Sequence, residues 1–246
     1  MKIGLAALSF KTKDIPYNQN KMIETLKKYS AQADLLVFGE SFLQGFQSLS
    51  WNYQIDEKIA LSLDDEIIQS LRAACKEYGI GLSFGFLGKE KQEIFSGQLT
   101  LDDMGKVINL FKRVSVGWKE TEADKDKRYV EGEGFHAFTY KGLDLAVGIC
   151  GDFWYEENIQ AINKLDKDLV LWPVYTDYNP KAWNETIKYE YAEQARLIGS
   201  KVFYVNSVCY DIQGEDVAKG GAVYFKTGLI EKELPSGSEG VLIVEI

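Results

Sequence analysis

Short runs of uninterrupted apolar residues at 35–38 (LLVF) and 169–172 (LVLW) are the feature of this sequence that most constrains its fold. Strands of this kind are typical of a sheet that is covered on both faces. Apolar positions at helical spacing predict amphipathic helices at residues 20–32, between Asp65 and Gly79, and at 156–165 and 180–198. The alternation of strands and helices therefore predicts an α/β protein.

Many further strands are expected, and they need a second layer to bury them. They are predicted at residues 3–10, 80–87, 202–206, 221–225, 229–234 and 241–246, with β-hairpins at 94–115 and 135–149. Two mixed sheets packed face to face with helices outside, a four-layer α-β-β-α sandwich, would bury this many apolar strands. The chain has no linker rich in Gly, Ser or Pro, so we expect a single domain over residues 1–246.

The charge balance narrows the class of partner. With 28 Lys and Arg residues against 37 Asp and Glu residues, the formal net charge is -9. Nucleic acids and anionic membranes are recognised by basic patches, so we expect neither as a partner. No apolar run approaches the ~18 residues that indicate a membrane span, and the first residues lack the pattern of a signal peptide. These observations favour a cytoplasmic protein with a small-molecule substrate.

The three cysteines, Cys75, Cys150 and Cys209, lie far apart in the sequence. Their spacing fits neither a metal site nor a disulfide framework, and no His/Cys/Asp cluster has the spacing of metal ligands. We therefore expect no metal or organic cofactor, and a reducing compartment. Cys75 lies on the apolar stripe of a helix and Cys209 lies just past a strand, positions that are typical of structural cysteines.

Cys150 has a different setting, because it directly follows the strand at residues 143–149, in the sequence VGICGDFW. A free cysteine is most often a core residue. Gly151, however, lets another group approach the backbone closely, and a helix is expected to begin near residues 154–157. A helix N-terminus and a nearby cation lower a thiol pKa from ~8.5 toward neutrality, and backbone N–H groups at such a turn can hold an oxyanion. Cys150 is therefore a candidate nucleophile.

A nucleophilic cysteine needs a base, and the sequence offers two candidates. His136 is the single histidine and lies in an alternating strand, so a Cys–His site would depend on this residue alone. Glu40 comes directly after LLVFG, at a carboxyl strand end, where α/β proteins tend to place their sites. A glutamate is mostly solvent-exposed, but burial can raise its pKa and make it a general base. Glu40 is the favoured candidate.

Four segments of the chain share their order and spacing with one family of enzymes. They are LLVFGE, GICGDFWYEE, YAEQARLIGSKVFYVNS and GGAVYFKTGLI. Together they resemble the nitrilase superfamily of carbon–nitrogen hydrolases nearly end to end, with Gly39 where the family usually has proline. The resemblance implies that Glu40 is the general base. It also implies that Cys150 attacks an amide or nitrile carbon to form a thioester, which water then hydrolyses.

The third catalytic position departs from the family pattern. The family's motif is Tyr-Arg-Lys-x-His-Leu, in which the lysine stabilises the tetrahedral intermediate. Counted from Gly105, the register places Arg113 at that lysine and Glu120 at the family's second structural glutamate. Arginine can stabilise an oxyanion but cannot shuttle a proton. Lys112, through a one-residue slip at a bulge, and Lys119, from the following loop, are the alternatives.

The resemblance implies hydrolysis of a small amide or N-carbamoyl compound, with simple amidase favoured over nitrilase, and a homodimer or larger homo-oligomer. Phe46, Trp154 and Tyr175 lie on segments expected at the mouth of the pocket and are candidates for substrate binding, although core packing fits each of them as well. A second hypothesis is a catalytically silent relative that binds a small molecule or serves as an assembly subunit. It gains support if no basic side chain faces Cys150.

Overall fold

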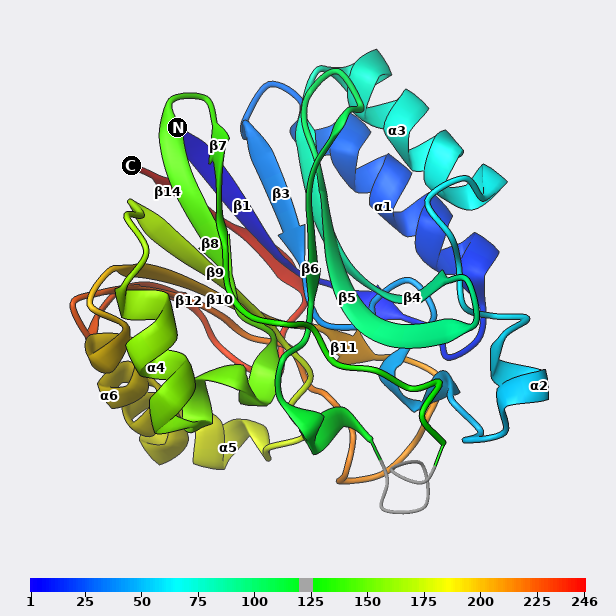
Figure 1. The fold of residues 1–246 in the computed structure, drawn as a ribbon. Coiled ribbons are helices and arrows are strands. Elements are labelled where there is room, and N and C mark those ends of the chain that lie inside the picture. The colour runs from blue at the N-terminus through cyan, green and yellow to red at the C-terminus, as the bar shows by residue number, and fades with distance from the viewer. Residues whose placement is uncertain (120–125) are drawn as a thin grey trace.

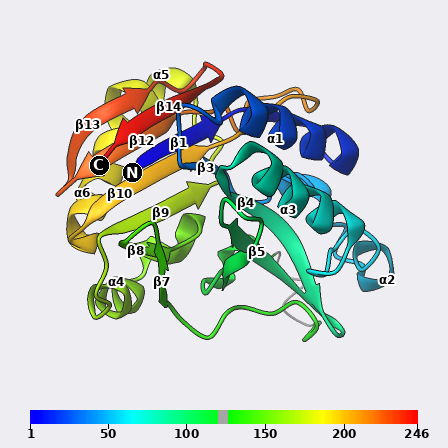
Figure 2. The same cartoon turned by 90° about the horizontal axis from the view of Figure 1, so that it is seen from above.

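The computed structural model describes residues 1–119 and 126–246, which form two six-stranded sheets packed face to face with helices on their outer faces (Figures 1 and 2). Two helices cover the first sheet, α1 (Ile15–Tyr29) and α3 (Glu66–Tyr78). The second sheet is covered by α4 (Glu156–Asn163), α5 (Pro180–Ala182) and α6 (Lys188–Ile198). This arrangement confirms the expected four-layer α/β fold.

The first sheet contains β1 (Lys2–Ala7), β3 (Leu35–Phe38), β4 (Gly81–Glu90), β5 (Glu93–Leu101), β6 (Val107–Lys112) and β14 (Gly240–Glu245). Its spatial order is β14-β1-β3-β4-β5-β6. The pairs β1–β3 and β3–β4 are parallel, whereas β14, β5 and β6 pair antiparallel with their neighbours. The sheet is therefore mixed, with a parallel centre.

The second sheet contains β7 (Ala137–Tyr140), β8 (Leu143–Val147), β9 (Leu169–Val174), β10 (Lys201–Asn206), β12 (Ala222–Lys226) and β13 (Leu229–Leu234). Its order is β13-β12-β10-β9-β8-β7, again with three parallel strands in the middle and antiparallel strands on both sides. The two sheets are thus built to the same plan, and the parallel strands of both have their carboxyl ends close to one another (Figure 1).

Short elements complete the described part of the chain. A two-stranded parallel ladder joins β2 (Ser9–Phe10) to β11 (Val208–Cys209) and so links the two halves of the chain. The remaining short elements are η1 (Phe46–Ser48), α2 (Tyr53–Asp56), η2 (Val116–Trp118), η4 (Cys150–Trp154) and η5 (Trp183–Ile187). None of the described helices is long and apolar enough to cross a membrane.

The strand expected at 3–10 is divided into β1 and β2, and several other elements differ slightly in extent from the sequence-based prediction. Two helices differ more. The helix expected at 20–32 begins five residues earlier, because Pro16 fits the first helical turn and the Asp14 carboxylate accepts a hydrogen bond from the Tyr17 amide at 3.1 Å. The helix expected at 180–198 is interrupted by the π-helical turn η5. Both differences depend on local capping and packing rather than on hydrophobic periodicity.

Apolar side chains fill three layers of core, one between the sheets and one outside each sheet. Both faces of the central strands are therefore buried, and their sequences are apolar throughout. The layer between the sheets is built from fully buried residues such as Leu5, Val37, Leu171, Phe203 and Val205. Outside the first sheet, Leu26, Leu71 and Cys75 pack from the helices, and outside the second sheet Ile162, Ala195 and Ile198 do the same. Helices on both outer faces therefore leave the strand ends as the place for polar groups.

Candidate active site

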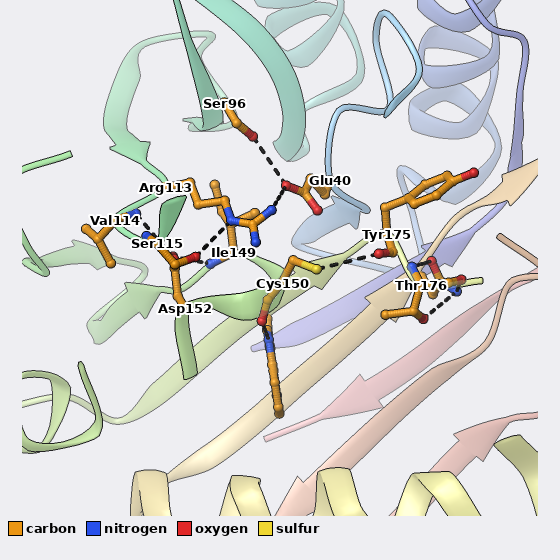
Figure 3. Close-up of polar contacts among 12 residues, drawn as sticks. Glu40, Ser96, Arg113, Val114, Ser115, Ile149, Cys150, Asp152, Tyr175 and Thr176 are labelled. Carbon is orange, nitrogen blue, oxygen red and sulfur yellow. Dashed lines mark hydrogen bonds and ion pairs between the residues drawn. The ribbon is translucent and has the colours of Figure 1, made fainter. Parts of the chain in front are cut away.

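Three strand ends bring a carboxylate, a guanidinium and a thiol together between the sheets (Figure 3). Glu40 follows β3, Arg113 follows β6, and Cys150 follows β8 as the first residue of η4. Figure 3 shows the three side chains turned toward one another, with Tyr175 beyond the end of β9 beside them. The grouping predicted from the sequence is therefore present in the fold.

Glu40 is buried, with 1% of its surface exposed. Its Oε1 accepts a hydrogen bond from Arg113 Nη1 at 2.8 Å and a longer one from Ser96 Oγ at 3.4 Å. Its Oε2 is also buried and has no hydrogen-bond partner among the described residues. Glu40 therefore keeps one acceptor oxygen for a proton that arrives during a reaction.

Two glycines allow the Glu40 backbone to lie where it does. An ideal Cβ on Gly85 of β4 would lie only 2.3 Å from the Ser41 amide nitrogen, so β4 can approach this segment only with glycine at that position. An ideal Cβ on Gly39 would lie 2.4 Å from Ser207 Oγ. The hydroxyl of Ser207 thus occupies the space that a larger residue at position 39 needs, which accounts for glycine in place of the family's proline.

Arg113 points into the site, where it pairs with Glu40. Its amide donates to the Ser96 carbonyl at 2.9 Å, which extends the ladder between β5 and β6 by one residue. Its side chain is 4% exposed and donates from Nε to Ser115 Oγ at 3.0 Å. Burial alone would lower the pKa of Arg113, but the nearby charges, that of Glu40 foremost, raise it above its usual value. Arg113 is therefore a permanent cation in this site.

The outer guanidinium nitrogen of Arg113, Nη2, faces the backbone beside the thiol. An ideal Cβ on Gly151 would lie 2.7 Å from Nη2, so only glycine permits this approach. The described residues offer no hydrogen-bond acceptor to Nη2, whereas Nη1 and Nε are both bonded. One donor of the guanidinium is thus available next to the nucleophile.

Cys150 is half-buried and has a strained backbone. Its φ of 46° lies in the left-handed region, which costs a residue with a side chain free energy and is common at functional positions. Its Sγ donates to the Tyr175 carbonyl at 3.5 Å, and its own carbonyl accepts from Trp172 Nε1 at 2.9 Å. The position of Cys150 is therefore fixed by hydrogen bonds to Trp172 on β9 and to Tyr175 just beyond the end of β9.

The thiol pKa moves in the opposite direction from the sequence-based expectation. A helix terminus and a cation were expected to lower it, but burial and then the charge of Glu40 raise the pKa of Cys150 to about 12, against the opposing charge of Arg113. The sequence argument omitted the desolvation of the thiol and the carboxylate beside it. Cys150 therefore rests as a neutral thiol and needs a base to become a nucleophile.

Asp152 is a structural hydrogen-bond acceptor. It is fully buried and accepts hydrogen bonds from the amides of Val114, Ser115 and Ile149 at 3.2, 2.8 and 2.8 Å. Burial raises the pKa of Asp152 to about 6, although the charge of Arg113 and the backbone donors oppose this. These bonds tie the segment after β6 to the segment after β8, so Asp152 fixes Arg113 relative to Cys150.

The two lysine alternatives point elsewhere. Lys112 lies opposite Gly97 in the ladder, its Nζ pairs with Glu90 Oε2 at 2.8 Å, and the register shift in this hairpin falls at the other end, between Thr100 and Leu101. The slip that would turn Lys112 into the site is therefore absent. Lys119 Nζ pairs with Glu131 Oε1 at 2.7 Å. Arg113 is the basic residue that the fold directs at Glu40.

His136 does not form a Cys–His pair. Its Nε2 lies 2.6 Å from Asn109 Oδ1, and its ring packs beside Phe111. The Cys–His hypothesis therefore finds no support in the described contacts. Glu120, expected at a second glutamate position, lies outside the described residues.

The aromatic candidates for substrate binding have different surroundings. Phe46 and Tyr175 stack with ring centroids 4.4 Å apart, and the Tyr175 backbone carbonyl accepts the Cys150 thiol. Trp154 is 45% exposed, and its ring contacts are with Trp172 and Tyr191. Tyr175 thus contacts the thiol directly and Phe46 contacts Tyr175. Substrate binding by Phe46, Tyr175 and Trp154 stays a prediction.

Sequence reasoning missed two polar partners of the site. Ser96 donates to Glu40, and Ser115 accepts from Arg113. Ser96 lies on β5, which carries no motif, and its role follows only from the pairing of β5 with β6. Among the described residues, no cluster of His, Cys, Asp and Glu side chains could hold a metal ion.

Residues 2–246 match the family model described as "Carbon-nitrogen hydrolase". The chain belongs to this family, and its fold is that of the nitrilase superfamily. It is 24% identical over 171 residues to an (R)-stereoselective amidase of a Pseudomonas species, with 70% of this chain and 59% of the relative covered. It is also 24% identical over 212 residues to an arylacetone-specific nitrilase of Alcaligenes faecalis, with 82% and 56% covered. The chain thus spans under two thirds of the length of both relatives.

Among solved structures, an amidase of the nitrilase superfamily from Nesterenkonia AN1 superposes with a TM-score of 0.81 at 22% identity, covering 100% of this chain and 90% of that one. Another structure of that amidase, a glutamate-to-glutamine mutant, carries acrylamide added to its active-site cysteine. At this identity the likeness establishes the fold.

Proposed function

We propose that this chain hydrolyses a small amide or N-carbamoyl compound through a thioester on Cys150. The proposal rests on the buried contact between Glu40 and Arg113 beside the thiol. Among the described residues, Glu40 Oε2 and Arg113 Nη2 have no hydrogen-bond partner in this contact. A base and an oxyanion donor are the two groups that a neutral thiol needs for attack on a carbonyl.

In the first half of the reaction, Cys150 Sγ attacks the carbonyl carbon while Glu40 accepts the thiol proton. The carbonyl oxygen becomes an oxyanion that Arg113 Nη2 and backbone N–H groups after Cys150 can stabilise. Glu40 then gives the proton to the leaving nitrogen, the C–N bond breaks, and ammonia or an amine departs. A thioester on Cys150 remains.

In the second half, Glu40 takes a proton from water, which attacks the thioester carbon. The C–S bond breaks, the thiolate recovers the proton from Glu40, and the acid leaves. Arg113 stays protonated throughout, since a guanidinium cannot be deprotonated in a protein. Every proton transfer therefore passes through Glu40, first from Cys150 to the leaving nitrogen and then from water to Cys150. The cation contributes charge and hydrogen bonds.

An amide is favoured over a nitrile as substrate. A nitrile needs two additions of water to reach the acid, whereas an amide needs one, so the amide route asks for fewer steps of the single base Glu40. The amidases among the relatives and the structural neighbours support the same choice, although nitrilases are also among the relatives. A homodimer or larger homo-oligomer and a cytoplasmic location stay predictions.

Acid-quenched turnover mixtures should contain an acyl group on Cys150. We expect incubation with acetamide, propionamide or N-carbamoyl-glycine to release ammonia, and intact-protein mass spectrometry with peptide mapping to place the acyl increment on Cys150 rather than on buried Cys75 or Cys209. Cys150→Ala should release no ammonia. Ammonia release by Cys150→Ala would contradict the thioester route, and a protein that reacts neither with these amides nor with amides of larger acyl groups would favour the silent relative.

A further inference from the structure

A pocket of about 280 Å³ opens beside the proposed active site. It lies between the loop that follows β3 and the turn η2 that follows β6. Its lining includes Phe46, Leu49, Trp51, Gly117, Trp118 and Lys119. A dry apolar cavity of roughly 150 Å³ is enough to take up benzene, so this pocket has room for a substituted ring.

Two sets of contacts connect this pocket to the catalytic groups. Phe46 in its wall stacks on Tyr175 with an angle of 5° between the rings, and the Tyr175 carbonyl is the acceptor of the Cys150 thiol. On the other wall, an ideal Cβ on Gly117 would lie 3.4 Å from Arg113 Nη2. The lining contains none of Glu40, Arg113 and Cys150, but one wall reaches the thiol through Tyr175 and the other lies beside Arg113 Nη2.

The walls of the pocket suit a flat, uncharged group. Trp51 and Trp118 lie with ring centroids 5.9 Å apart at 46°, and Phe46 and Leu49 complete the apolar lining. The one cation in the lining, Lys119, has its charge balanced by Glu131 at 2.7 Å. Aromatic side chains offer an aryl group a large contact area and ring-to-ring contacts. A charged ligand would lose its hydration, and the charge of Lys119 is already balanced by Glu131.

We propose that this pocket is the acyl subsite and that it takes an aryl or arylalkyl group, so that the substrate class is arylalkanoic amides such as phenylacetamide. The inference rests on the proposed function. In a primary amide the nitrogen carries only hydrogen, so the acyl side is the part of the substrate that needs a pocket. A planar ring enters between Phe46 and Trp51, and this places its amide carbon toward Cys150.

The ratio of kcat/KM for phenylacetamide to kcat/KM for acetamide tests the proposal. Leu49→Trp fills the pocket, and we expect it to lower this ratio by at least about tenfold, because one or two methylene-sized changes in an apolar pocket already discriminate by this factor. The control is Leu229→Trp, which enlarges an exposed leucine in an unrelated surface pocket and should leave the ratio unchanged. A ratio that Leu49→Trp does not change would overturn the proposal.

A binding experiment separates failure of the subsite from failure of the proposed function. Isothermal calorimetry of phenylacetamide with Cys150→Ala measures binding without turnover, and we expect Cys150→Ala/Leu49→Trp to bind at least about tenfold more weakly. If both variants bind equally, the pocket is not the subsite, whatever the activity. If binding depends on Leu49 but the wild-type protein hydrolyses no amide, the subsite stands and the hydrolase proposal fails.

Discussion

Glu40→Gln is expected to lower the rate of amide hydrolysis by roughly a thousandfold, in the middle of the range for loss of a general base. Glutamine can still accept the hydrogen bond from Arg113, but it cannot take the thiol proton from Cys150 or return it to the leaving nitrogen. Burial is the largest cause of the raised thiol pKa and remains in the variant, so little thiolate forms near neutral pH without the base. Steady-state ammonia release at saturating amide gives the effect on kcat.

Glu90→Gln is the matched control for this prediction. Glu90 also pairs with a cation, Lys112 at 2.8 Å, but this pair is partly exposed and Lys112 points away from the site although it directly precedes Arg113. Its removal should leave hydrolysis within about twofold of the wild type, since exposed ion pairs contribute little. If Glu40→Gln retained a large part of the activity with normal far-UV circular dichroism, Glu40 would not be the base.

Arg113→Met is expected to reduce both stability and activity. It leaves the Glu40 carboxylate buried without its cation, and removal of one partner of a buried pair typically costs about 3–5 kcal/mol. It also removes the donor that faces Cys150, which corresponds to a loss of about a hundredfold to a thousandfold in kcat for an oxyanion-hole donor. Urea denaturation and ammonia release measure the two effects separately.

Two further variants determine which property of Arg113 matters. Lys112→Met changes the neighbouring residue, which points to the opposite face and pairs with exposed Glu90; it should cost at most about 1 kcal/mol. Arg113→Lys keeps the charge, but a single ammonium on a shorter side chain cannot contact both Glu40 and Ser115 as the guanidinium does. We expect intermediate stability and partial activity. Equal effects of Arg113→Met and Lys112→Met would contradict the role given to Arg113.

Much of the fold was predictable because its signals are local. The runs at 35–38 and 169–172 became β3 and β9, buried on both faces, and the polar residues after the strands lie at their carboxyl ends. The register of the family resemblance placed Arg113 rather than Lys112 at the third catalytic position, and in the structure Arg113 pairs with Glu40 whereas Lys112 pairs with Glu90. Glu40, Arg113 and Cys150 could therefore be grouped before their distances were known.

The electrostatics of the site were not predictable from the sequence, because they depend on what packs around each group. The sequence-based argument predicted a lowered pKa for Cys150. The pKa is raised instead, because burial and the charge of Glu40 outweigh the charge of Arg113. Ser96 gained its role through the pairing of β5 with β6, which no motif announces, and Ser115 gained its role through the turn that follows Arg113. The pocket beside the site likewise joins Phe46 to Gly117, which belong to loops after different strands.

The pH dependence of Cys150 alkylation by iodoacetamide, in wild type and in Glu40→Gln, tests the central claim most directly. In the wild type Glu40 accepts the proton as the thiol reacts, so the rate constant should be nearly constant from about pH 6 to about pH 9. In Glu40→Gln the charge that raises the thiol pKa is gone while Arg113 remains, so the thiol pKa falls below about 12 and the rate should rise with pH as thiolate forms. Peptide mass spectrometry reads the rate at Cys150. Two profiles of the same shape would contradict a thiol activated by Glu40.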